Sequence, residues 1–118
     1  MIGVRRRKAA RSGIERSVRR EYPSHLKWLR GCECAVAGKA GHICLGKIEA
    51  AHIRRGTSGG TSLKPADYHA VPLCSSAHAE QHTIGEQSFD AKYSVNLNAL
   101  ADALAKASPH RWRWEEGR

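Results

Sequence analysis

Two histidines near position 80 are spaced so that they could bind one metal ion. His78 and His82 are four residues apart, and on a helix side chains at this spacing leave the same face. Imidazole pairs of this kind recur in catalytic metal sites. His52 lies well before them, and if the pair holds a cation, a neutral His52 stays free to accept a proton. The pattern indicates a metal ion beside a group that can transfer a proton, although two surface histidines on a polar helix and an ordinary core or surface histidine at 52 would look the same.

A second set of metal-binding side chains comes from two separate segments of the chain. Four soft or borderline donors would complete a closed tetrahedral zinc site: Cys34, His42, Cys44 and Cys74. Cys32 competes with His42 as the fourth ligand. The alternatives are buried free thiols or a small scaffold stapled by disulfides. Since the first residues include no hydrophobic segment behind the arginines, we expect no secretory signal, a cytoplasmic location and reduced thiols.

The charge of the chain favours a polyanionic partner. The 118 residues carry a formal net charge of +9, and basic residues crowd the first thirty positions. This excess indicates a nucleic acid, whereas no apolar stretch suits a membrane. Arg54, Arg55 and Lys64 are candidates for gripping phosphates, although a solvated basic loop would look the same. Trp112 and Trp114 either stack on unpaired bases or, as we favour, pack against the last helix.

The elements that must position these side chains follow from turn residues and apolar spacing. Ser24 is the expected N-cap of a first core helix that ends at Gly31, Gly-rich turns indicate a knuckle, and Ser75 is the expected cap of the helix carrying the histidine pair. The expected elements are a helix over 24–31, strands over 47–53 and 68–74, and helices over 75–85 and 96–108. A further helix is possible over 14–21, ended by Pro23. The pattern predicts a small α+β fold.

The stretch "EAAHIRRGTSGGTSLKPADYHAVPLCSSAHAEQH" resembles the HNH endonucleases, most closely the small prophage-type nucleases that act in recombination. The resemblance covers about residues 24–89. It implies a zinc-stabilised ββα-metal core, also called a His-Me finger, with flanking helices. The chain then divides into a basic N-terminal arm over 1–23, the nuclease core over 24–90, and a C-terminal helix and tail over 91–118.

The resemblance also implies roles for individual residues. His52 takes the place of the general base, and His78 and His82 take the places of metal ligands on the helix. The middle asparagine of the family is absent, and Asp67 is preferred to His69 in its place, as a catalytic residue or as a further metal ligand. The residue before the base, often a ligand, is Ala51 here.

The implied activity is a metal-dependent endodeoxyribonuclease with low sequence specificity. Its expected cofactors are a structural Zn²⁺ and a catalytic divalent cation, Mg²⁺, Mn²⁺, Ni²⁺ or Zn²⁺. Its expected partner is single- or double-stranded DNA, with a recombinase filament as a further candidate. The alternative is a non-catalytic, zinc-stabilised module that binds nucleic acid.

Overall fold

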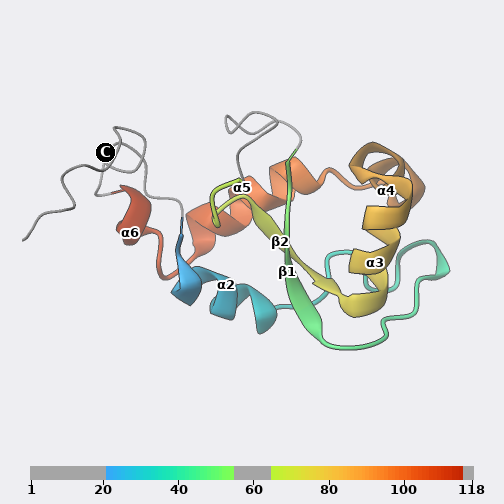
Figure 1. The fold of residues 1–118 in the computed structure, drawn as a ribbon, viewed down its shortest axis with the longest axis horizontal. Coiled ribbons are helices and arrows are strands. Elements are labelled where there is room, and N and C mark those ends of the chain that lie inside the picture. The colour runs from blue at the N-terminus through green and yellow to red at the C-terminus, as the bar shows by residue number, and fades with distance from the viewer. Residues whose placement is uncertain (1–20, 55–64, 116–118) are drawn as a thin grey trace, which may run out of the picture.

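The computed structural model describes residues 21–54 and 65–115 of the chain. Figure 1 shows two strands at the centre with helices around them. In chain order the elements are α2 (Pro23–Arg30), η1 (Lys39–Gly41), β1 (Ile48–His52), β2 (Ala70–Cys74), α3 (Ser75–Ile84), α4 (Glu86–Tyr93), α5 (Leu97–Ala107) and α6 (Trp112–Glu115). The predicted α+β class is confirmed. The helix expected over 14–21 falls outside the described residues.

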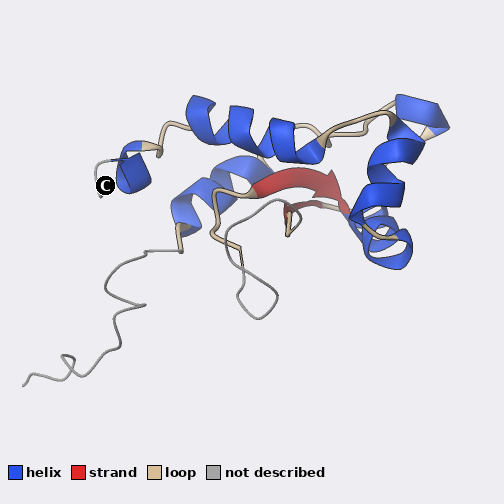
Figure 2. Ribbon diagram, turned by 90° about the horizontal axis from the view of Figure 1, so that it is seen from above, coloured by secondary structure: helices blue, strands red, loops and turns tan. Residues whose placement is uncertain are grey.

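β1 and β2 form an antiparallel pair in which His52 lies opposite Ala70 and Ile48 lies opposite Cys74. Because side chains alternate across a strand, one face carries Ala51 and Ile53 together with Val71 and Leu73. These four side chains are buried, and they pack with further residues from the helices: Ala77, Phe89, Leu97 and Ala101. Figure 2 shows α5 running along one side of the strand pair.

The helix ends differ from expectation at both predicted serine caps. Ser24 is not the N-cap of α2, because the helix begins at Pro23 and Tyr22 is the N-cap. Proline suits the first helical position, since its missing N–H would have no helical partner there. Ser75 is likewise the first residue of α3, and Cys74 is the N-cap. The stops at Gly31 and before Pro109 are confirmed.

The C-terminal part holds two helices that the periodicity did not predict, α4 and α6. Trp114 in α6 is buried and packs against Tyr22, Tyr68 and His25, with ring centroids 5.0 to 5.3 Å away. Trp114 also shares a buried cluster with Ala105 of α5, so the prediction that the tail tryptophans pack against the last helix is confirmed for Trp114. Trp112 is 51% exposed, so it is not a core residue. No helix in the described part is long and apolar enough to cross a membrane.

Candidate functional site

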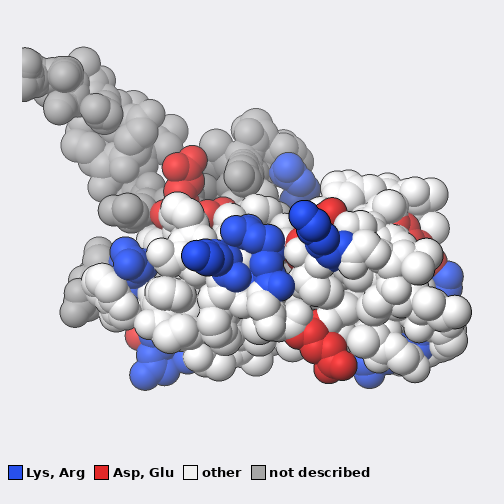
Figure 3. Space-filling model, turned by 90° about the horizontal axis from the view of Figure 1, so that it is seen from below, with Lys and Arg blue, Asp and Glu red and all other residues white. Residues whose placement is uncertain are grey.

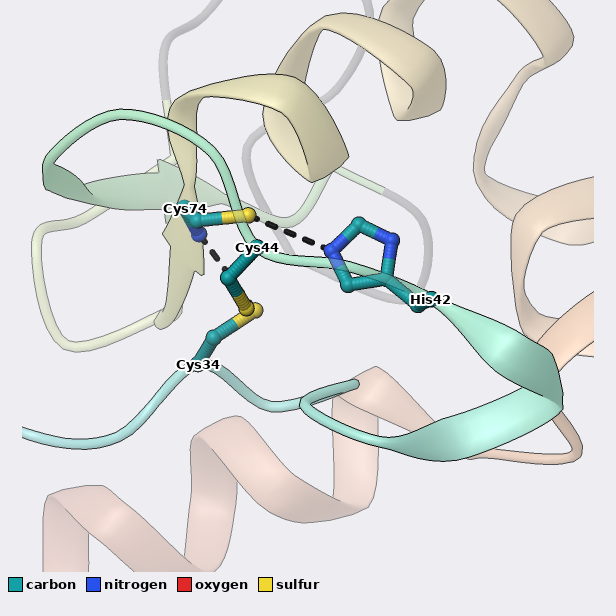
Figure 4. A group of neighbouring side chains, drawn as sticks. All are labelled: Cys34, His42, Cys44 and Cys74. Carbon is teal, nitrogen blue, oxygen red and sulfur yellow. Dashed lines mark hydrogen bonds between the residues drawn. The ribbon is translucent and has the colours of Figure 1, made fainter.

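The four predicted ligands of the closed metal site lie together. One donor atom from each of Cys34, His42, Cys44 and Cys74 lies within 4.8 Å of all the others, an arrangement that could hold a metal ion. Figure 4 shows the three sulfur atoms and the imidazole pointing toward one another. His42 Nε2 is 3.3 Å from Cys74 Sγ. Three sulfurs and one imidazole are a donor set typical of structural zinc sites.

The cluster forms because the segment after α2 runs beside β2. The Ala35 N–H donates to the carbonyl of Pro72, and the Cys74 N–H donates to Cys34 Sγ at 3.4 Å. The knuckle then returns to the start of α3, where the Ser76 N–H donates to the Leu45 carbonyl. Contacts between residues some 30 to 40 positions apart thus bring the four donors to one point.

Gly46 lets the knuckle approach α3 closely. Its φ is +85°, and a Cβ placed on it would lie 2.6 Å from Ser75 Cβ. Non-bonded carbon atoms do not approach this closely, so a side chain at this position would push the knuckle away from the helix. Gly46 is therefore required both by its backbone conformation and by the space available.

The thiols have unequal acidity when no cation lies among them. Burial by itself raises the pKa of Cys74, but hydrogen bonds with the Ser76 hydroxyl, the Ala77 N–H, His42 and the Leu45 N–H outweigh it and lower that pKa to about 6. Removal from water, together with hydrogen bonds and charges from Cys74 and Cys34, raises the pKa of Cys44 to about 12. The Cys74 thiolate thus forms readily, whereas Cys44 resists a second negative charge beside it. A divalent cation would stabilise both thiolates.

Cys32 is not part of the cluster. Its thiol donates to the carbonyl of Trp28 at 3.5 Å, and burial raises its pKa. Of the two candidates for the fourth ligand, the structure therefore places His42 and not Cys32 beside the other three. All four cysteines are free thiols, which disagrees with a disulfide-stapled scaffold.

Behind the cluster, His42 has a second contact that the sequence reasoning missed. The Tyr93 hydroxyl lies 3.5 Å from His42 Nδ1 and donates to Glu80 Oε1 at 2.5 Å. Glu80 is also paired with Lys92. These groups can orient the imidazole so that Nε2 faces the sulfurs. Tyr93 is 51 residues from His42, so no local spacing could have indicated it.

The predicted histidine pair on α3 is also present. His78 Nε2 and His82 Nε2 lie 3.2 Å apart. Two nitrogens that each bind a tetrahedral Zn²⁺ at roughly 2.0–2.1 Å would be about 3.3 Å apart, so the spacing fits a shared cation. His78 is partly buried, and His82 is exposed, which leaves coordination positions open to solvent.

Glu49 completes this pair, and sequence reasoning did not identify it. Its Oε1 is 2.7 Å from His78 Nδ1, and its Oε2 accepts from the Ser75 hydroxyl at 2.8 Å. The hydrogen bonds to His78 and Ser75 lower the pKa of Glu49. An ionised carboxylate only accepts, so Nδ1 of a neutral His78 must carry the proton and Nε2 keeps its lone pair for a metal. The position expected for a further ligand was directly before His52, at Ala51, whereas the carboxylate is three residues before His52.

His52 forms a separate pair with Asp67. The His52 Nε2 and Asp67 Oδ1 atoms are 2.8 Å apart, and Oδ2 of Asp67 accepts from the Tyr22 N–H at 2.7 Å. Asp67 is buried, whereas the His52 ring is partly exposed. Both oxygens of Asp67 thus have partners other than the α3 pair. By the same donor argument, neutral His52 holds its proton on Nε2 and its lone pair on Nδ1.

The structure therefore assembles the predicted catalytic residues as two pairs. We expected His52 to face the helical histidines, but the β1 side chain that contacts them is Glu49. Alternation along β1 directs Glu49 and His52, three residues apart, to opposite faces of the strand. The Arg54 N–H donates to Glu86 Oε2, which anchors the end of β1 to the start of α4. Arg54 is exposed, and Arg55 and Lys64 lie outside the described residues.

Comparison of the chain with protein-family models, with curated proteins and with solved structures found no match in any of the three.

Proposed function

We propose that this protein is a metal-dependent endonuclease of the HNH type that hydrolyses DNA phosphodiester bonds. The observation that carries the proposal is the His78–His82 pair, with two Nε2 atoms 3.2 Å apart and a carboxylate behind one ring. The pair stands on the helix that directly follows two antiparallel strands, the order of a ββα-metal core. The charge of +9 agrees with a nucleic-acid substrate.

In this proposal His52 is the general base, and Asp67 positions it. Asp67 holds the ring through Nε2 and leaves the Nδ1 lone pair free to take a proton from water. Asp67 is itself held by the Tyr22 N–H, so the imidazole has a rigid support. A role for Asp67 as a metal ligand has less support, because both of its oxygens are already engaged.

His78 and His82 would hold the divalent cation, with water and phosphate oxygens completing its coordination. A bound divalent cation supplies charge stabilisation to the phosphate and to the departing oxygen. Histidine ligands suit Zn²⁺, Ni²⁺ or Mn²⁺ better than Mg²⁺. We further propose that Cys34, His42, Cys44 and Cys74 hold a structural Zn²⁺ and that exposed Arg54 contacts a neighbouring phosphate.

The test is nicking of circular single- and double-stranded DNA in the presence of each divalent cation in turn. His52→Ala should lower the cleavage rate by roughly 10²–10⁴-fold while DNA affinity, measured by fluorescence anisotropy, stays nearly unchanged. Glu49→Gln should raise the metal concentration needed for half-maximal cleavage by roughly 10–100-fold. Asp102→Asn, which removes a carboxylate from the exposed surface of α5, is the matched control. It should change neither the cleavage rate nor the metal concentration needed for half-maximal cleavage.

The competing function is a zinc-stabilised module that binds nucleic acid without cutting it. The separation of the His52–Asp67 pair from the His78–His82 pair favours this competing function, because a hydrolase needs the base and the metal ligands to reach one phosphate. It is the conclusion to draw if the wild-type protein nicks no DNA with any cation while still binding it. Equal nicking by wild type and His52→Ala would instead point to a contaminating nuclease.

A further inference from the structure

One side of α2 borders a hollow of about 550 Å³. Its walls come from both ends of the described chain, because His110 precedes α6 and the other residues belong to α2 and the turn after it. The lining residues are Ser24, Lys27, Trp28, Gly31, Cys32 and His110. Sites for small planar ligands commonly have volumes of this order. The hollow is separate from both metal-binding groups.

Trp28 gives this hollow a fixed aromatic surface. Its ring stacks on the buried ring of His25, with centroids 5.6 Å apart and an interplanar angle of 30°. The Trp28 side chain is only half-buried, although its backbone is held within the helix. A tryptophan supported in this way and bordering a hollow is suited to stack on a flat, unpaired ring.

The charge beside the hollow is positive. Lys27 and Arg30 are exposed in the last turn of α2, and no lining residue is a carboxylate. Figure 3 shows Lys and Arg side chains gathered on the face that is seen from below, where α2 lies. Two other hollows have mixed charge: one near the start of α2 includes Glu21 beside Arg113, and one beside Tyr68 includes Asp102 and Glu115 beside Lys106. Their carboxylates offset the attraction of these cations for a phosphate backbone.

We propose that the α2 hollow binds one unpaired base of single-stranded DNA, with Trp28 stacked on the base and Lys27 and Arg30 on the flanking phosphates. The proposal rests on the proposed function for its choice of DNA as the partner, and it adds the preferred strandedness. In a duplex the bases are paired and stacked inside, so this hollow would favour a single strand.

Binding is measured with the His52→Ala protein, without divalent cation, so that no cleavage is involved. A fluorescent oligonucleotide should bind more tightly as a single strand than as a duplex at equal salt. Trp28→Leu should weaken single-strand binding by roughly 5- to 100-fold, whereas Trp28→Phe, which keeps an aromatic ring, should lose far less. Lys27→Gln should lower the slope of log affinity against log salt by about one ion, and Lys106→Gln on α5 serves as its matched control.

A photocrosslink tests the position directly and does not depend on whether Trp28→Leu folds. An oligonucleotide carrying 5-iodouracil should crosslink to Trp28 in the otherwise unaltered His52→Ala protein, as read by peptide mass spectrometry. A crosslink confined to Trp112 or to the residues before position 21, or equal affinity for the duplex, would overturn the proposal. If nicking fails in every metal but the crosslink maps to Trp28, the nuclease proposal falls and this one stands; the reverse result removes this one alone.

Discussion

At the scale of single residues, two histidines are each held by a carboxylate that fixes the imidazole. Glu49 holds Nδ1 of His78, and Asp67 holds Nε2 of His52. The two carboxylates therefore leave different nitrogens free, one suited to a metal and one suited to a proton. The identity of the ring nitrogen that is held decides what each histidine can do, and this is set by contacts 29 and 15 residues apart in the chain.

His25 is a buried histidine for which the structure gives a pH-dependent role in stability. Its Nδ1 is 2.9 Å from the Ser108 hydroxyl, and burial, then the charge of His110, lowers its pKa to about 4 against a weaker opposing effect of Asp67. In the unfolded chain the pKa returns to about 6.5. Between these pH values the unfolded state binds more protons than the folded state. The contribution of neutral His25 to the free energy of unfolding is therefore complete above about pH 6.5 and is lost as the pH falls toward 4.

We therefore expect the free energy of unfolding to fall less between pH 7.5 and pH 5 in His25→Gln than in the wild type. The difference in slope should correspond to at most about 2 kcal/mol over this interval, measured by urea unfolding. Any loss of a metal bound by the cysteine–histidine cluster at low pH would affect both proteins and cancel in the comparison. Parallel pH profiles would show that His25 is not the group responsible.

At the scale of elements, the junction of β2 with α3 carries residues of both the cysteine–histidine cluster and the His78–His82 pair. Cys74 ends the strand as a member of the cluster, and the helix that starts after it carries His78 and His82. Ser75 holds Glu49, and Ser76 holds the knuckle through Leu45. A displacement of the start of α3 would therefore disturb the cluster and the histidine pair together.

Gly46→Ala tests this junction. The new Cβ would clash with Ser75, so the variant should be less stable by roughly 1–3 kcal/mol than Gly38→Ala, and it should bind the cluster metal more weakly. Gly38 is the matched control, because its φ is +74° but no atom lies within 4 Å of a Cβ there. Chemical denaturation and bound-metal analysis give the two quantities. Ser75→Gly should restore part of the loss in a double-mutant cycle; full additivity would mean that the clash is not the cause.

At the scale of the whole molecule, a thin apolar core depends on cross-links between distant segments. The core around β1 and β2 includes several alanines and a single phenylalanine, Phe89. The Cys34, His42, Cys44 and Cys74 cluster joins the segment after α2, the knuckle and the strand–helix junction. In a small domain, the binding energy of a structural metal is available as folding energy.

If the cluster holds a structural Zn²⁺, as proposed, removal of that ion should destabilise the entire protein. We expect Cys44→Ser, or treatment with a strong chelator, to lower the Tm by roughly 10–25 °C and to abolish the cooperative transition in the extreme case. Cys32→Ser should keep one equivalent of tightly bound zinc and a nearly unchanged Tm, since Cys32 lies outside the cluster. Metal content measured by mass spectrometry and calorimetry provide the readouts. An unchanged Tm in Cys44→Ser would exclude a structural role for the metal.

Local spacing and residue chemistry were enough to predict the α+β class, the two strands, α3, α5 and three members of the cluster, Cys34, Cys44 and Cys74. These features depend on periodicity and on residue chemistry, both of which are readable along the chain. The helix starts were less accurate, because Ser24 and Ser75 look like caps locally while Pro23 and the contacts of Cys74 determine the observed starts. The placement of His78 and His82 on one face of a helix was predicted directly from their four-residue separation.

The sequence by itself thus indicated which side chains have the chemistry to bind a metal or to accept a proton. Only the tertiary structure decided that His42 rather than Cys32 joins the three other cysteines, that Glu49 supports His78, and that His52 pairs with Asp67. Those partners are set by the antiparallel register of β1 and β2, by the packing of α2, α3 and α5 against the strands, and by the packing of α4 against α3. Contacts between residues far apart in the chain have no periodic signature, because they depend on how whole elements pack.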